Sequence, residues 1–491
     1  MGVGRTNSRG GGGGVNKTLP PQIENLKITV KNAQVILEGS YQSVTNLAGT
    51  LIVYKQGEQP PIDVTDGASV AFVGTGTIFS LTNLVNKNLY TFRVFPYNDN
   101  LQYQTDILGA TISGTPMEHI VFGLRIDNQN SNPLTRCEYT DNAIGMTKGD
   151  IASWSAREIF KDIRPCCVAN PINANKTGSL ASYYLNPNNT SRKVDGTAAD
   201  ITSGAYDVMT EFKRFGYKIE TDSRYTYVKI TDSPNGVGYS YRHMSRVNEG
   251  DRAYMYVGRY LGYVLNSKLR SVSGIMPTVN ISFTQSRQYA VNNLNQSNSP
   301  YKLIAFDQIT AIQCLFLIMF GSTNSQKALG QGWTYPSASA ATNTGGANTK
   351  GMYFGDTGGS QVTFAGIEDI YGNVESWVGG LFCDSNVNIL TAFNNFNDDG
   401  AGYRNHGKAG KGEVGGRITQ VQGTSEMGFI IKTGSGSDTT YYADHSQFTP
   451  SKLPTLGGNW GSGDTGGLFC LPLAWEASYA YIKQSARLAL C

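Results

Sequence analysis

Short alternations of apolar and polar residues, separated by turn residues, run from Pro20 to Pro116. The clearest of them lie at 26–30, 50–54 and 90–95. Runs of this length and spacing are typical of antiparallel sheets in which each strand buries one face. The sequence therefore predicts a β-sandwich over residues 19–116.

Residues 1–18 differ from this pattern because they contain five consecutive glycines and almost no apolar side chains. Glycine-rich segments of this kind behave as flexible coil. We expect a Gly-rich flexible arm, which is either a plain disordered tail or an arm that docks onto another chain.

From residue 117 onward the chain is rich in Gly, Asn, Ser and Tyr, and only two helices stand out. Ser282–Leu294 begins with a residue suited to capping a helix. Asp307–Phe320 reads as a buried helix, because five apolar residues share one face. We expect a β-rich connecting region over 117–204 and an α+β domain with long loops over 205–491. The face of the second helix carries Ile309, Ile312, Leu315, Phe316 and Met319.

The balance of charged residues makes nucleic acid and anionic membranes poor candidates as partners. The chain has 40 Lys and Arg residues against 37 Asp and Glu residues, a net charge of +3 over 491 residues. Such a weak field does not attract nucleic acid or an anionic membrane surface. Few charges and 28 tyrosines exclude a disordered chain and leave tyrosine available for surfaces.

The sequence lacks both a membrane-directed segment and a pattern of paired cysteines. The first twenty residues carry no apolar signal segment, and the longest apolar run of the second helix, Cys314–Phe320, is too short to span a bilayer. We expect a soluble chain made in the cytoplasm, without membrane insertion. Seven cysteines at irregular spacing, with no CxxC pair, predict buried free thiols and no metal site.

The segment 81–94 resembles the fibronectin type III family. In that family a leucine precedes by six residues a tyrosine that caps a corner of the sheet, and Leu84 and Tyr90 have this spacing. The core tryptophan that the family carries on its second strand is absent here. The resemblance implies a fibronectin III-like module that acts as a spacer.

Three stretches together resemble a second family. They are Gly366–Gly380, Gly457–Trp460 with the C-terminal residues, and 206–212 with 256–260 and 271–277. They are similar to the C-type lectin-fold proteins of tailed-phage virions, which include receptor-binding tropism determinants diversified by retroelements. The fold is shared with the formylglycine-generating enzymes. The resemblance implies a mixed, β-rich chain with a C-type lectin-fold domain over 205–491.

The residues that carry this resemblance also have a structural interpretation. Ile367, Ile370, Val374 and Trp377 recur at helical spacing, which predicts a turn-and-helix element that buries the tryptophan. Trp460 follows two glycines and would anchor a bend. Three residues are therefore assigned to the scaffold, and the arginine among them is expected to pair with a carboxylate at the edge of the core: Trp377, Trp460 and Arg487.

The candidate ligand-binding residues lie in two C-terminal segments, 461–467 and 472–484. The resemblance places ligand contacts on the face that this part of the chain builds. Tyrosine and tryptophan give large contact area at small entropic cost, and small polar residues add adaptable hydrogen bonds. The alternative is a structural strand over 478–481. The candidates are Asp464, Thr465, Trp475, Glu476, Ser478, Tyr479, Tyr481 and Lys483.

Enzymatic interpretations find little support in the sequence. Asp398, Asp399 and Glu368 could bind calcium or act as a glycosidase pair, but residues around 394–415 also read as a long polar surface loop. The calcium-binding triplets of lectins are absent, as are known catalytic motifs. We expect no enzymatic activity, no cofactor and no metal.

Together these features predict a phage virion protein, most simply a tail-tip adhesin that attaches to a glycan or protein receptor on the host cell. Its N-terminal arm and sandwich would contact other virion proteins. Weak contacts multiplied over copies favour a homo-oligomer such as a trimer. Two alternatives remain: a capsid or tail decoration protein with weak glycan adhesion, and a polysaccharide hydrolase.

Overall fold

The computed structural model describes residues 18–105, 110–116, 118–173, 178–246, 250–294, 299–335, 340–408 and 414–491. The chain forms two compact units, which divide between His119 and Ile120. Nearly all of the predicted arm at 1–18 lies outside the described residues.

The N-terminal unit is built from two antiparallel sheets whose inner faces share one apolar core. Ile23, Leu37 and Phe79 of one sheet and Ile52 and Phe92 of the other are buried in it, because alternate residues of each strand point inward. The predicted sandwich is therefore found. One sheet contains β1 (Ile23–Lys31), β2 (Gln34–Tyr41) and β5 (Ile78–Thr82), and the other contains β4 (Ala68–Val73), β3 (Gly49–Gln56), β6 (Tyr90–Tyr97) and β7 (Thr111–Gly114).

Leu84 and Tyr90, which carry the fibronectin III-like spacing, are both buried in this core. The phenol oxygen of Tyr90 accepts a hydrogen bond from the backbone N–H of Val85 at 3.1 Å. The tyrosine thus fastens the loop that precedes its own strand.

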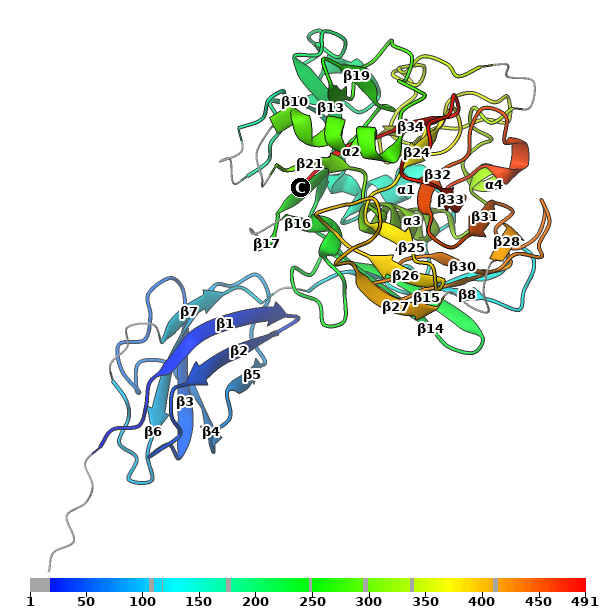
Figure 1. The fold of residues 1–491 in the computed structure, drawn as a ribbon. Coiled ribbons are helices and arrows are strands. Elements are labelled where there is room, and N and C mark those ends of the chain that lie inside the picture. The colour runs from blue at the N-terminus through cyan, green and yellow to red at the C-terminus, as the bar shows by residue number, and fades with distance from the viewer. Residues whose placement is uncertain are drawn as a thin grey trace, which may run out of the picture. The chain divides into compact units, whose positions relative to one another are not determined.

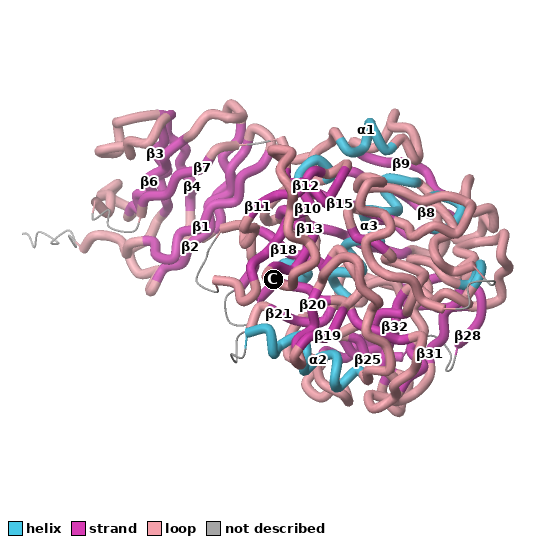
Figure 2. The backbone as a smooth tube through the Cα atoms, turned by 90° about the horizontal axis from the view of Figure 1, so that it is seen from above, coloured by secondary structure: helices cyan, strands magenta, loops and turns pink. Residues whose placement is uncertain are grey.

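The larger unit, from Ile120 to Cys491, consists mostly of short strands joined by long loops (Figure 2). Its widest sheet is antiparallel and has the C-terminal strand near its edge. In order across the sheet, the strands are β12 (Asn189–Lys193), β11 (Tyr183–Asn186), β10 (Arg164–Ala169), β13 (Tyr206–Lys213), β18 (Tyr254–Gly258), β35 (Leu488–Leu490) and β21 (Tyr301–Leu303).

The sheet that matters most for the site contains six strands and is mixed, with parallel pairs β24–β34 and β31–β33. Its strands, in order, are β28 (Val414–Arg417), β31 (His445–Phe448), β33 (Leu473–Trp475), β32 (Leu453–Leu456), β24 (Glu375–Trp377) and β34 (Gln484–Ala486). Strands from distant parts of the sequence therefore lie side by side.

Smaller sheets complete the strand content of this unit. One holds β14 (Gly216–Thr221), β15 (Tyr225–Thr231), β8 (Val121–Asp127) and β9 (Cys137–Asp141), and another holds β25 (Leu381–Cys383), β26 (Asn388–Thr391) and β27 (Arg404–Lys408). The two-stranded pairs are β16 (Ser245–Arg246) with β17 (Gly250–Asp251), β19 (Tyr263–Leu265) with β20 (Lys268–Arg270), β22 (Thr363–Phe364) with β23 (Ile367–Glu368), and β29 (Gln420–Gln422) with β30 (Ile430–Thr433).

Helix α3 (Phe306–Phe320) is buried over its whole length, as its apolar sequence predicts. Helix α2 (Phe283–Val291) lies beside β21 (Figure 1) and starts with the predicted Ser282 cap, whose hydroxyl accepts from the N–H of Gln285. No described helix has the length and apolarity needed to cross a membrane. The remaining helices are α1 (Ile151–Ser155), α4 (Ser325–Ala328), η1 (Phe160–Asp162), η2 (Arg242–Met244), η3 (Asn292–Leu294) and η4 (Gly463–Thr465).

Two expectations differ from the structure. Residues 117–204 do not form a separate region, because β8 and β10 are inner strands of sheets completed by residues of 205–491. The helix predicted within 366–380 is wrong, since this stretch contains β23, turns and β24. Positive φ angles at Asp369 and Asn373 interrupt any helix there, although Trp377 is buried as expected.

Candidate functional site

The predicted aromatic residues of the C-terminal segment gather at the surface. The chain leaves the six-stranded sheet after β33 and returns in β34, so the proposed strand over 478–481 is not formed. The rings of Trp475 and Tyr479 stack with centroids 4.7 Å apart and an angle of 12°. The ring centroids of Tyr479 and Tyr481 are 6.1 Å apart, and the exposed fractions are 38% for Tyr479 and 40% for Tyr481. We call these three residues the aromatic surface.

A chain of buried hydrogen bonds holds Trp475 in place. Its indole N–H donates to the hydroxyl of Thr455 at 3.2 Å, and this hydroxyl donates to Glu375 at 2.7 Å. The second carboxyl oxygen of Glu375 accepts from the side-chain amide of Asn459 at 2.8 Å. Burial raises the pKa of Glu375, and the bonds from Thr455 and Asn459 oppose that rise. The half-buried tryptophan is thereby tied to a buried carboxyl on β24.

Trp460 and Lys483 form a second contact near this chain of bonds. The ammonium group of Lys483 lies 4.1 Å from the ring centroid of Trp460, a cation–π geometry. The backbone carbonyl of Lys483 accepts a hydrogen bond from the N–H of Glu375. Trp460 is half-buried and supports a cation, whereas Trp377 is fully buried and donates its indole N–H to the carbonyl of Ile281.

The remaining predicted polar residues are mostly engaged with other side chains or with the backbone. Glu476 pairs with Lys452 at 3.0 Å, and Asp464 pairs with Arg417 at 2.8 Å. Thr465 donates its hydroxyl to a nearby backbone carbonyl, and Ser478 is exposed. Asp464 also lines a depression that includes no residue of the aromatic surface. The structure therefore brings the aromatic candidates together but not all of the polar ones.

Arg487 is buried where distant parts of the chain meet. Its guanidinium is fully buried and donates to four backbone carbonyl oxygens, those of Gly258, Arg259, Glu368 and Asp369, at 2.7–3.0 Å. The loops converge on the arginine with their carbonyl groups, so its hydrogen bonds go to backbone oxygens, while the nearby carboxylates of Asp369 and Glu368 interact with its charge. Burial lowers the pKa of Arg487 to about 10.

Two of the three carboxylates considered for catalysis or calcium binding are held by neighbouring groups, whereas Asp399 is exposed and accepts a hydrogen bond from the N–H of Ala401 at 3.0 Å. Glu368 is buried and accepts hydrogen bonds from the N–H groups of Gly345 and Ala347. Asp398 accepts from the Thr284 hydroxyl at 2.8 Å and from the Arg287 guanidinium at 3.2 Å. Among the described residues, no cluster of three or more His, Cys, Asp or Glu side chains is placed to hold a metal ion.

The seven cysteines of the sequence are free and buried, as expected. Burial raises the pKa of Cys137 and of Cys167 to about 12, so neither is a reactive thiolate near neutral pH.

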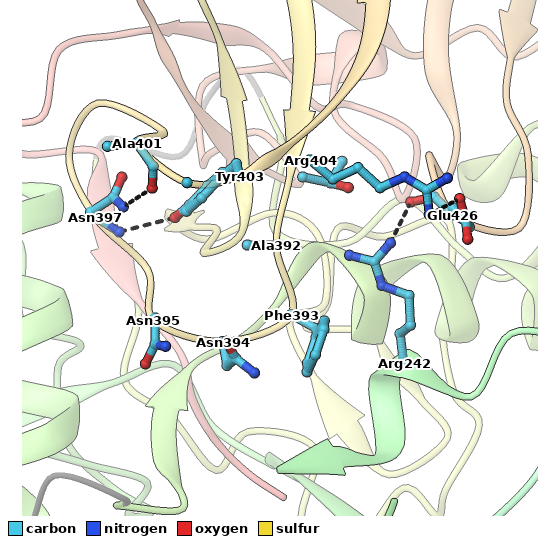
Figure 3. Close-up of a pocket in the computed structure, with 12 residues that line it drawn as sticks. Arg242, Ala392, Phe393, Asn394, Asn395, Asn397, Ala401, Tyr403, Arg404 and Glu426 are labelled. Carbon is cyan, nitrogen blue, oxygen red and sulfur yellow. Dashed lines mark hydrogen bonds and ion pairs between the residues drawn. The ribbon is translucent and has the colours of Figure 1, made fainter. Parts of the chain in front are cut away.

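A pocket that sequence reasoning missed lies where the chain joins β26 to β27 (Figure 3). The loop from Ala392 to Tyr403 forms one wall, and Arg242 of η2, Arg404 and Glu426 form another. The cavity has a volume of about 510 Å³. The sequence predicted a polar surface loop here, or calcium binding or catalysis by Asp398 and Asp399, but not a pocket with arginines. The run of asparagines was the available signal, but nothing in it indicates the distant arginine.

Comparisons with known proteins give weak matches. No family model and no curated protein matches the sequence. The Major Tropism Determinant U1 variant aligns over 82% of this chain and 80% of its own, with 11% identity and a TM-score of 0.25. The M1 variant aligns over the same shares with 10% identity and a TM-score of 0.24. The chain is thus weakly similar to tropism determinants.

A computer-based redesign of a β-sandwich protein aligns over 20% of this chain and 94% of its own. Its identity is 20% and its TM-score is 0.16. At such TM-scores, none of these alignments demonstrates a shared fold or function.

Proposed function

We propose that this chain is a phage virion protein that attaches to a molecule of the host-cell surface through the aromatic surface. The observation that carries the proposal is the stacking of Trp475 on Tyr479 at an exposed position, with Tyr481 beside them. Binding is favoured when a partner covers large aromatic rings that were in contact with water. Tryptophan and tyrosine contribute most of the binding free energy at many known interfaces. The sequence resemblance to lectin-fold virion proteins supplies the phage context.

The fixed position of Trp475 supports a role in binding. Its hydrogen bond to Thr455, continued to the buried Glu375, restrains the ring before a partner arrives. A restrained side chain loses less entropy on binding than a mobile one. Lys483, seated on Trp460, adds a positive charge close to the same buried chain of bonds.

The rest of the chain would link this surface to the particle. We assign the N-terminal arm and the sandwich to contacts with other virion proteins. A surface of three aromatic residues binds weakly by itself, so several copies in a homo-oligomer would be needed for firm attachment. A trimer detected by light scattering on the full chain would agree with this arrangement, and a monomer would contradict it.

The attachment role is tested with the fluorescently labelled full chain on a panel of bacterial strains, read by flow cytometry. The test variant is Tyr479→Ala/Tyr481→Ala. The matched control is Tyr225→Ala/Tyr227→Ala, a second pair of partly exposed tyrosines at the same sequence spacing with centroids also 6.1 Å apart.

We expect the wild type and the control to stain the same strains, and the test variant to need at least ten times the concentration. Circular dichroism confirms that both variants are folded. Equal staining by the test variant would exclude the aromatic surface, and a wild-type chain that stains no strain would count against attachment.

A further inference from the structure

The pocket between β26 and β27 has walls that are fixed by internal bonds. The N–H of Asn397 donates to the phenol oxygen of Tyr403 at 3.0 Å, and its side-chain amide donates to the carbonyl of Ala401 at 2.8 Å. Gly400 has a φ of +71°, and a Cβ atom there would lie 2.7 Å from the ring of Phe382. Only glycine fits this position without movement. The cavity is therefore part of the fold rather than a gap in a loose loop.

Arg242 at the pocket forms no ion pair with a described residue, although the buried carboxyl of Asp307 interacts with its charge. Arg404 pairs with Glu426 at 2.5 Å. Arg242 reaches only the backbone carbonyl of Glu426, at 3.5 Å, and its guanidinium lies 5.4 Å from the ring centroid of Phe393. Within the described part of the chain, the Nε of Arg242 has no hydrogen-bond partner and no carboxylate forms an ion pair with this side chain.

His406 contacts the lining of the pocket. Its ring contacts the hydroxyl of Thr391, which lines the pocket, at 2.7 Å. Burial lowers the pKa of His406, the charges of Arg404 and Arg242 lower it further, and the carboxylate of Glu426 opposes them. Two arginines and one glutamate line the pocket, so an anion entering it would meet a net positive charge.

Neutral groups on the loop complement the charge. The side chains of Asn394 and Asn395 line the pocket and form no hydrogen bond with any described residue (Figure 3). Each amide offers both donors and an acceptor, which is the combination that sugar hydroxyl groups require. The rings of Phe393 and Tyr403 lie on the same lining and provide apolar area. A few polar groups with aromatic area in one cavity are typical of small-ligand sites.

We propose that this pocket binds a sugar residue that carries a carboxylate. The guanidinium of Arg242 would hold the carboxylate, because two parallel N–H bonds match its planar shape. Asn394 and Asn395 would contact hydroxyl groups, and an aromatic ring would cover the C–H face of the sugar. A volume of about 510 Å³ lies within the usual range of such sites. The proposal is independent of the aromatic surface, because none of its three residues lines this pocket.

The test is calorimetric titration of the full chain with methyl β-glucuronide, with methyl β-glucoside and with acetate. The glucuronide and the glucoside differ only at the carboxylate, and acetate carries the carboxylate without the sugar. We expect the glucuronide to bind at least tenfold more tightly than either of the others. The variant Arg242→Gln should lose at least tenfold in affinity, whereas Arg242→Lys should retain part of it.

The matched control is Arg224→Gln, because Arg224 is paired with Asp127 at 2.7 Å and does not line the pocket. Thermal unfolding of each variant separates loss of binding from loss of folding. Equal affinity for glucuronide and glucoside would refute the role of the carboxylate, and equal affinity for acetate would refute the sugar site.

Unchanged binding by a folded Arg242→Gln variant would refute the assignment of that residue. The Tyr479→Ala/Tyr481→Ala variant should bind the glucuronide normally, so failure at one surface is distinguished from failure at the other.

Discussion

Replacing Thr455 by Val removes the hydroxyl that joins Trp475 to Glu375 and preserves the shape of a fully buried side chain. Two hydrogen bonds are lost, at 2.7 Å to the carboxyl and at 3.2 Å from the indole. A bond to a charged group contributes about 1.5–3 kcal/mol and a neutral one about 0.5–1.5 kcal/mol. The free energy of unfolding should therefore fall by about 2–4.5 kcal/mol at neutral or higher pH.

The size of this effect should depend on pH. Burial raises the pKa of Glu375 in the folded protein above its value in the unfolded chain. The contribution of this carboxyl group to the free energy of unfolding is therefore complete at low pH and is lost as pH rises through the folded pKa. The Thr455 hydroxyl opposes that rise in pKa, and its removal raises the folded pKa further. The variant should thus lose more stability at pH 8 than at pH 4.

Urea unfolding followed by tryptophan fluorescence measures this loss, since all five tryptophans of the sequence lie between Trp154 and Trp475 and report only the larger unit. The control is Thr226→Val. Thr226 is equally buried, but its hydroxyl contacts only the neutral side chains of Asn128 and Thr221. A Thr455→Val loss no greater than the control, or one independent of pH, would refute the reasoning.

Three further predictions concern buried or strained positions. Burial raises the pKa of Asp369 to about 7, so the stabilising contribution of this carboxyl group is complete below about pH 4 and disappears as pH rises through 7. The variant Asp369→Asn should therefore flatten the pH dependence of the free energy of unfolding in urea between these two pH values. An unchanged pH profile would contradict the assignment. Arg487→Lys cannot serve four carbonyl groups and should cost about 3–5 kcal/mol in the same assay, whereas a loss under about 1 kcal/mol would exclude the role. Gly400→Ala should lower the free energy of unfolding by about 1–2 kcal/mol, because Gly400 has a positive φ and lies close to Phe382. The same variant should weaken glucuronide binding in the titration. Normal stability and normal binding would contradict the claim that this loop is rigid.

Several elements were predictable because their information is local. Alternating residues over 19–116 predicted the sandwich, and continuous apolar sequence predicted the buried helix α3. The cap at Ser282 followed from its residue type and position. The exposure of Tyr479 and Tyr481 agrees with what the family resemblance implied for this segment.

Only the tertiary structure decided the rest. The spacing from Ile367 to Trp377 suits a helix, but Asn373 instead donates to the backbone carbonyls of Trp333 and Thr342, and both it and Asp369 have positive φ. The partners of Arg487 come from residues more than one hundred positions away, as does Arg242 relative to the loop around Asn394. Periodicity encodes which face of an element is buried, whereas contacts between distant segments depend on how those faces are assembled. The sequence alone therefore determined the sandwich strands and the helices α2 and α3, and the assembled sheets determined the turns within 366–380, the stacking of Trp475 and the pocket.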